Sequence, residues 1–310
     1  MAITAQQVKE LREMTGCGIM DCKKALTECD GDIEKAIDKL REKGMAKAEK
    51  KASRAAAEGI VASNIAEDGK SGCIVEVNIE TDFAAKTPKF IAFVDAISNQ
   101  VMATDVADAE ALKETTIDGK DVDTFRKEAI ADIGENISIR RFAKFAINGN
   151  GAVTSYIHAG GKVGVLVEIV TDNDDVISTP EFKTFAKDIG MQIAASNPTW
   201  ITKEDVPAEA IERETEVIRN KAIAEGKPAK IIDERIVPGQ IKNFYSINCL
   251  MNQEFVKADD GQSIEAYISS VAKNLGCDIS ITNFARFAMG EGLEKKEDDF
   301  ASEVMKQAGL

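Results

Sequence analysis

Apolar residues in the first fifty positions recur with the spacing of amphipathic helices. Residues 4–7 match a capping box, and Ile3 with Val8 has the spacing of a hydrophobic staple. Three successive apolar faces predict three helices; they are Val8 and Leu11 with Thr15, then Cys22, Ala25, Leu26 and Cys29, then Ile33, Ala36, Ile37 and Leu40. Gly44 predicts the end of the third helix, and residues 45–54 predict a solvated linker or helix.

The rest of the chain contains a repeat. Residues 72–77 align with residues 164–169 at an offset of 92, and residues 137–139 align with residues 279–281 at an offset of 142. Each copy predicts the order strand, turn, strand, helix, helix, strand. Helices starting at Pro88 and Pro180 should bury matching apolar sets, namely Phe90, Val94, Ile97 and Val101 in the first copy and Phe182, Phe185, Ile189 and Ile193 in the second. With hairpin turns at Asp68-Gly69 and Gly160-Gly161, the pattern predicts an α+β fold with antiparallel pairing.

The jump in offset means that the second copy holds about fifty extra residues. Two amphipathic stretches around a breaker at residues 225–228 predict an antiparallel helical hairpin there; the apolar positions are Ile211, Thr215 and Ile218, then Ile231, Ile232, Ile236 and Ile241. The predicted domains are therefore 1–54 (three helices with a linker), 55–150 (first core copy), 151–200 with 251–290 (second core copy), 201–250 (helical hairpin) and 291–310 (C-terminal module). The last has a short helical pattern at Phe300, Val304 and Met305.

Composition narrows the class of protein. The 310 residues suggest two or three domains, and a net charge of −14 argues against nucleic-acid binding, which needs a basic surface. No apolar run is long enough to span a membrane, and the N-terminus has no apolar signal region. Six scattered cysteines and a single histidine favour a reducing cytoplasm over a disulfide framework.

The corner Thr81-Asp82-Phe83 is the candidate site. It follows the strand-like run 73–79, where Thr81 or Asp82 could cap the next helix. A ring at such a corner should project outward, and the second copy has no ring there. We therefore interpret Phe83 as a probe for a partner, while Asp82 as a mere helix cap stays an alternative.

Several catalytic readings are weak. Residues 64–71 fall one glycine short of a phosphate-binding loop and precede a strand, whereas such a loop must open a helix. Cys17, Cys22 and Cys29 lack the spacing of zinc ligands. A nucleophile pair would need His158, which sits at a predicted hairpin turn. We expect no catalytic residue, no metal and no cofactor.

Several segments in order resemble the family of bacterial elongation factor Ts. They are Leu11-Arg12 with residues 15–26, Thr81-Asp82-Phe83, residues 133–137, His158 with Gly160-Gly161, and Phe287 with residues 290–292. The resemblance covers essentially the whole chain. Two positions depart from the family pattern: Ala84 stands where valine is usual and leaves less apolar contact beside the probe, and Glu254 stands where many members have proline.

The resemblance implies a guanine-nucleotide exchange factor that binds elongation factor Tu, both GDP-bound and nucleotide-free, and has no active site of its own. In this family the corner, here Thr81, Asp82, Phe83 and Ala84, acts as a wedge that disturbs the Mg²⁺ site of the GTPase. Ile133, His158, Gly160 and Gly161 would line the same contact surface. Arg12, Ile19 and Met20 would dock the N-terminal helices, which resemble a ubiquitin-associated module.

Other interpretations remain open at this point. Ile133 and Met20 are apolar, so either could belong to the core. The chain could be an interaction scaffold instead, a three-helix module on a duplicated body, and the helical hairpin leaves self-association open. An enzyme would need to turn over a substrate alone, and no motif supports that.

Overall fold

The computed structural model describes residues 3–15 and 17–294 of the chain. It confirms the predicted α+β class, with helices and antiparallel sheets. The described part of the chain divides into two compact units, the first within residues 3–62, 75–142 and 288–294 and the second with residues 63–74 and 143–287. The predicted domain boundaries stay a prediction, and nearly all of the C-terminal module, including Phe300, Val304 and Met305, lies outside the described residues.

Three N-terminal helices form as the pattern predicts: α1 (Ala5–Thr15), α2 (Ile19–Glu28) and α3 (Ile33–Lys51). The capping box is confirmed, because the amide of Gln7 donates to the hydroxyl of Thr4 over 3.2 Å and the amide of Thr4 donates to the Gln7 side chain over 3.0 Å. Their shared core consists of buried apolar side chains; these are Val8, Leu11, Cys22, Ala25, Leu26, Ala36 and Leu40.

The predicted stop at Gly44 is wrong, because α3 continues to Lys51 and no separate linker follows it. Ala48 is fully buried, and a Cβ built on Gly44 would lie 3.0 Å from the Cβ of Ala131 on α7 (Val122–Ile133). Ion pairs join the same two helices, Arg41 to Glu128 over 2.8 Å among them. A glycine inside a helix costs about 1 kcal/mol relative to alanine, but here it lets two helices approach closely.

The first copy of the repeat forms a sheet in the order β1 (Glu58–Ile65), β2 (Ser71–Ile79), β5 (Ile137–Ala146). Helices α4 (Asp82–Ala85), α5 (Pro88–Ala103) and α6 (Ala109–Lys113) lie between β2 and β5 in the chain, followed by α7. The buried set predicted for α5 is confirmed, with Phe93 added. Sequence reasoning missed a small antiparallel hairpin, β3 (Thr116–Ile117) with β4 (Lys120–Asp121), although its turn, Asp118-Gly119, is a strong hairpin signal.

The second copy forms the sheet β6 (Gly151–His158), β7 (Val163–Thr171), β8 (Ile279–Ala288), in that order. β6 and β7 pair antiparallel, from Gly151 opposite Val170 to His158 opposite Val163. The 3₁₀ helix η1 (Asp174–Ser178) and helix α8 (Pro180–Ser196) follow β7, and α12 (Ile264–Leu275) precedes β8. The core predicted on α8 is confirmed.

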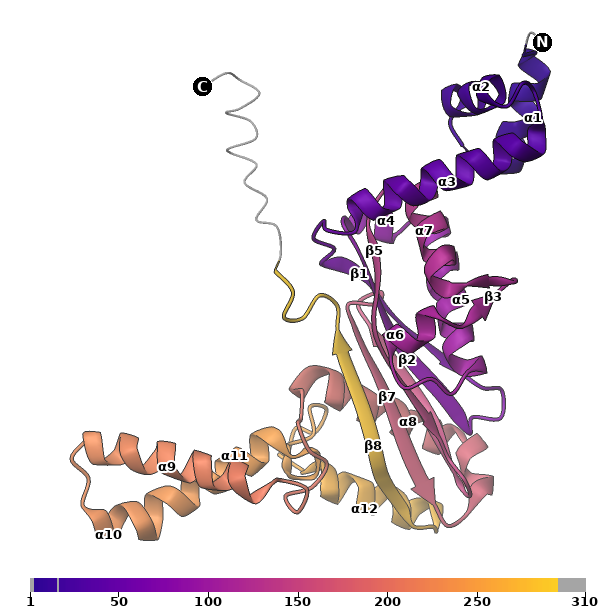
Figure 1. The fold of residues 1–310 in the computed structure, drawn as a ribbon. Helices are drawn as coiled ribbons and strands as arrows, with labels where there is room; N and C mark the ends of the chain where they lie inside the picture. The colour runs from indigo at the N-terminus through magenta and orange to yellow at the C-terminus, as the bar shows by residue number, and fades with distance from the viewer. Residues whose placement is uncertain (1–2, 16, 295–310) are drawn as a thin grey trace. The chain divides into compact units, whose positions relative to one another are not determined.

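The inserted residues form the predicted helical hairpin. Figure 1 shows α9 (Ala208–Ala224) beside the returning arm, which comprises α10 (Ala229–Ile231), the π-helical η2 (Ile232–Ile236) and α11 (Val237–Asn248). One predicted apolar position is wrong, because Ile231 is exposed while Ile232 is buried. Pro238 lacks an amide hydrogen for the ordinary helical ladder, and the wider π turn lies just before it. A short 3₁₀ helix, η3 (Leu250–Asn252), leads back towards α12.

Among the described residues, none of the helices combines the length and the apolar run needed to cross a bilayer.

Candidate functional site

The corner after β2 is built by a capped single-turn helix. Thr81 has an extended backbone and its hydroxyl accepts a hydrogen bond from the amide of Ala84 over 3.2 Å, so Thr81 is the N-cap of α4. Ala84 and Ala85 are buried beneath this turn, whereas the ring of Phe83 is 81% exposed. The predicted outward direction of Phe83 is therefore confirmed. Ala84 faces the interior instead of lying beside the ring.

Asp82 is not the helix cap that the alternative interpretation made it. Its carboxylate pairs with Lys86 one turn later, over 2.6 Å, and the Lys86 ammonium lies 5.9 Å from the centre of the Phe83 ring. The hydrogen bond from Lys86 lowers the pKa of Asp82 below its ordinary value. The corner thus presents an ionised, solvent-exposed carboxylate directly beside an exposed ring.

The turn between α7 and β5 holds this corner in place. The amide and the hydroxyl of Thr81 both donate to the carboxylate of Glu135, over 2.9 and 2.8 Å. Lys89 on α5 pairs with Asp132 at the end of α7 over 2.6 Å. The half-buried Ile133 is the last residue of α7, so the structure brings it into the same neighbourhood as Thr81. Sequence reasoning quoted Glu135 only as part of a motif and gave it no role.

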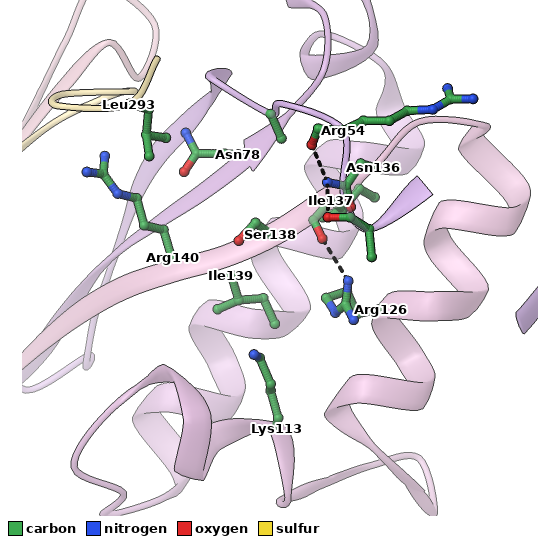
Figure 2. Close-up of a pocket in the computed structure, with 12 residues that line it drawn as sticks. Arg54, Asn78, Lys113, Arg126, Asn136, Ile137, Ser138, Ile139, Arg140 and Leu293 are labelled. Carbon is green, nitrogen blue, oxygen red and sulfur yellow. Dashed lines mark hydrogen bonds between the residues drawn. The ribbon is translucent and has the colours of Figure 1, made fainter. Parts of the chain in front are cut away.

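A cavity of about 350 Å³ lies where the end of α3, β5 and α7 meet. Figure 2 shows Asn136 and Arg126 directed at the backbone, Asn136 donating to the carbonyl of Arg54 over 2.8 Å and Arg126 to that of Ile137 over 3.0 Å. Its positive side chains have carboxylate partners, such as Asp123 for Arg126. The cavity therefore marks a structural junction between the N-terminal helices and the first sheet.

A second exposed group lies on the N-terminal helices. Arg12 on α1 and Ile19 and Met20 at the start of α2 are all exposed, Met20 by 75%. The alternative that Met20 belongs to the core is therefore wrong. Met14 is exposed as well and was missed, because its position gives no apolar periodicity to find it by.

The remaining predicted residues lie in the second unit, at the β6–β7 hairpin. His158 is exposed at the end of β6, and its Nδ1 lies 3.2 Å from the hydroxyl of Tyr156. Ala159, Gly160 and Gly161 all have positive φ, which suits the glycines and makes Ala159 unusual. Gly160 is exposed and Gly161 is buried, so these two glycines shape the turn that presents His158.

The motif at residues 290–292, one of those behind the family resemblance, contributes to packing inside the first unit. Glu76 on β2 is fully buried and accepts hydrogen bonds from Arg140, Arg141 and the amide of Gly290, over 2.8, 2.6 and 2.8 Å. A Cβ on Gly290 would lie 2.2 Å from the carbonyl oxygen of Ala57. Gly290 is therefore required where the chain packs against the first sheet.

Comparison with known proteins shows the family of the chain. The family model described as elongation factor TS matches residues 80–291. The chain is 51% identical over 313 aligned residues to elongation factor Ts of Trichlorobacter lovleyi, with all of both chains covered. It is 49% identical over 308 residues to that of Clostridium botulinum strain Eklund 17B and 48% identical over 307 residues to that of Nitratiruptor sp., with 99% of each chain covered. The exposed corner, the hairpin and the N-terminal helices are thus parts of a translation elongation factor, and the chain belongs to the elongation factor Ts family.

Proposed function

We propose that this protein binds GDP-bound elongation factor Tu, promotes release of GDP, and stays bound until GTP displaces it. The observation that carries the proposal is the 81% exposed ring of Phe83 on a helix held by Thr81. A solvent-exposed ring contributes no burial free energy to the fold, but it does so to a complex when it enters an apolar crevice of a partner. Such burial contributes about 1.5–3 kcal/mol.

Exchange requires a difference in affinity and no covalent chemistry. Nucleotide binding to a GTPase of this kind depends on Mg²⁺ that bridges the phosphates and on amides around them. A protein that binds the distorted, nucleotide-free GTPase more tightly than the GDP-bound form lowers the affinity of the GTPase for GDP. By linkage, bound GDP lowers the affinity of the GTPase for that protein by the same ratio. Phe83 provides the wedge, and Asp82 beside it brings a negative charge towards the surroundings of the Mg²⁺ ion.

The other predicted residues fit the same proposal as contacts. Ile133, His158, Gly160 and Gly161 would complete the surface that holds the GTPase, since His158 and Gly160 are exposed, Gly161 shapes their turn and Ile133 is half-buried at the end of α7. Arg12, Ile19 and Met20 would form a second contact on the N-terminal helices. A second contact of this kind raises the effective concentration of the wedge at its target.

The direct test is stimulated release of a fluorescent GDP analogue from elongation factor Tu. Phe83→Ala should lower the stimulated rate by about tenfold or more, because one ring's burial is lost, while the free energy of unfolding changes by no more than about 0.5 kcal/mol. Phe83→Leu should keep part of the rate.

Phe90→Ala is the contrasting variant, because Phe90 lies fully buried on α5. It should lower stability by about 3–5 kcal/mol. If Phe83→Ala instead melts many degrees lower while its exchange rate is normal, Phe83 is a core residue and the wedge is wrong.

A further inference from the structure

A helix as short as α4 cannot fix the direction of Phe83 by itself. It has four residues, and isolated helices of that length are unstable because nucleation is costly. The cap from Thr81 and the buried Ala84 and Ala85 hold it from one side. The ring itself is 81% exposed, with the Lys86 ammonium 5.9 Å from its centre, so its direction follows from the backbone of α4 and therefore from what fixes Thr81.

Glu135 fixes Thr81 through both of its polar groups. The hydroxyl of Thr81 donates to Oε1 of Glu135, and a hydroxyl has only one hydrogen to donate. Its lone pairs are therefore left for the amide of Ala84, the contact that caps α4. The amide of Thr81 donates to Oε2 of the same carboxylate. Hydrogen bonds to an ionised acceptor are the stronger kind.

The contact is one half of a reciprocal clamp. Glu80, next to Thr81, accepts a hydrogen bond from the amide of Asn136 over 2.6 Å, and Glu135, next to Asn136, accepts one from the amide of Thr81. The clamp is anchored in turn, since Lys51 at the end of α3 donates to the carbonyl of Gly134. Two chain segments more than fifty residues apart are thus joined by two reciprocal hydrogen bonds, in each of which a carboxylate of one segment accepts from a backbone amide of the other.

The second copy of the repeat keeps one half of this clamp and lacks the other. Asp172 occupies the position of Glu80 and accepts a hydrogen bond from the amide of Asp278, which occupies the position of Asn136, over 2.8 Å. At the position of Glu135, however, stands Cys277, a buried thiol. The half that both copies share serves the fold. The half that contains Glu135 occurs in the copy that carries Phe83.

We propose that Glu135 is a positioning residue, which sets the direction of Phe83 by holding the hydroxyl and the amide of Thr81. This inference rests on the proposed exchange function, because Glu135 acts through Phe83 and touches no nucleotide. Removing its carboxylate leaves the ring on the surface but lets α4 and its cap sample other orientations. Fewer encounters with the GTPase then place the ring in its crevice.

The test measures stimulated GDP release at increasing concentrations of the factor. Glu135→Ala should lower the maximum rate about fivefold, the effect of one net hydrogen bond, with half-saturation at the wild-type concentration. Glu135→Gln should keep most of the rate, because its amide oxygen can accept from the Thr81 amide while its NH₂ group donates to the hydroxyl. Glu110→Ala is the matched control, since it removes a surface carboxylate that pairs with Lys113 on α6, and it should behave as wild type.

A merely structural role gives a different pattern. A partly unfolded variant contains less active factor, so half-saturation moves to higher total concentration while the maximum rate stays normal; that result overturns the proposal. Should Glu135→Ala fail to fold, Thr81→Val keeps the amide contact with Glu135, removes the hydroxyl that both donates to Glu135 and caps α4, and should lower the maximum rate. A normal maximum rate for Thr81→Val would also overturn the proposal.

The decisive arm is the double variant. In a Phe83→Ala background, Glu135→Ala should cause no further loss, because the ring through which it acts is gone. A full additional fivefold loss would show that Glu135 acts elsewhere. If the wild-type protein itself does not accelerate GDP release, the proposed function fails; a normal rate for Glu135→Ala beside an active wild type defeats only the positioning role.

Discussion

At the corner after its second strand, the first copy of the repeat exposes a phenylalanine, whereas the second copy exposes a carboxylate. Phe83 and Asp175 occupy equivalent positions and both point to solvent. The two corners share their outline, with Asn173 capping η1 as Thr81 caps α4, and with a Thr-Pro start to the next helix. The fold therefore needs the cap and the following helix but not the ring. What differs between the corners is free to serve function.

A second difference lies inside the two sheets. Glu76 is fully buried between Arg140, Arg141 and the Gly290 amide, while its counterpart Glu168 is half-buried and accepts a hydrogen bond from the Thr282 hydroxyl over 2.6 Å. Thr282 stands where the first copy has Arg140. Glutamates at equivalent positions are thus a charged hub in one copy and an ordinary hydrogen-bond acceptor in the other.

The largest effect should come from breaking that hub. Glu76→Ala takes away the buried carboxylate that Arg140, Arg141 and the Gly290 amide share, and removing one partner of a buried pair costs about 3–5 kcal/mol. Glu168→Ala should cost about 1 kcal/mol, the value of one hydrogen bond. Urea unfolding of both variants beside the wild type measures the contrast, and equal losses would refute it.

The same hub predicts a dependence on pH. Burial opposes ionisation of Glu76, but the Gly290 amide and the two arginines outweigh it and hold its pKa below the ordinary value. A pKa that is lower in the folded chain contributes stability above the unfolded value, about 4.3, and loses it as the pH falls towards the folded value. The advantage of the wild type over Glu76→Gln should therefore shrink below about pH 4.3. An advantage that grows in acid would contradict this sign.

Exchanging the corner residues sharpens the functional side of the comparison. Phe83→Asp gives the first copy the residue of the second, and should lower stimulated GDP release at least as far as Phe83→Ala, by about tenfold or more. Asp175→Phe should leave the exchange rate unchanged, since its corner lacks the Glu135 half of the clamp. Similar losses in both variants would show that both corners contact the GTPase.

A smaller effect is expected where the copies differ in the space between helix and strand. A Cβ on Gly190 of α8 would lie 2.6 Å from the Cβ of Tyr156, while the first copy has Ser98 at the position of Gly190 and Asn64 at the position of Tyr156. Gly190→Ala should destabilise the protein by about 1–3 kcal/mol through overpacking, and should shift the NMR signals of the His158 ring that Tyr156 contacts. Ser98→Ala is the matched control with a smaller loss, and equal losses would contradict the argument.

The smallest effect should follow removal of the helical hairpin, which the first copy lacks. Its buried residues Ile218, Ala222 and Ile232 are not part of the core cluster of the second unit. Replacing residues 208–241 by a Gly/Ser loop keeps the ring contact between Trp200 and Phe244. The shortened chain should stay folded by circular dichroism. Its rate of stimulated GDP release should fall by less than tenfold, which corresponds to about 1.4 kcal/mol. Loss of all soluble protein would show that the hairpin completes the core.

The sequence predicted those parts of the fold that rest on local pattern or on the repeat. The helices from Pro88 and Pro180 and the outward ring of Phe83 followed from periodicity and from comparing the copies. The predicted helix end at Gly44 was wrong because it rested on the local preference of glycine for helix ends. In the structure the helix continues, and Gly44 packs closely against Ala131. The prediction for Ile231 was wrong because Ile231 and Ile232 are neighbours, and adjacent helical residues point in different directions.

The role of Glu135 could not be read from local pattern, since its partner Thr81 lies 54 residues away. One signal was available nonetheless. Aligning the copies places Glu135 opposite Cys277. One copy thus has a carboxylate where the other has a buried thiol, and packing alone does not explain that difference.

Helix α3 belongs to two structures at once, and this sets how the molecule comes apart. Its first half supplies Ala36 and Leu40 to the N-terminal core, and its second half packs Gly44 and Ala48 against α7. Local opening in proteins proceeds in cooperative blocks, and a helix shared by two blocks joins them. Amide hydrogens in α1, α2 and α7 should then exchange with solvent in one common event, so that the N-terminal helices and α7 lose their protection together.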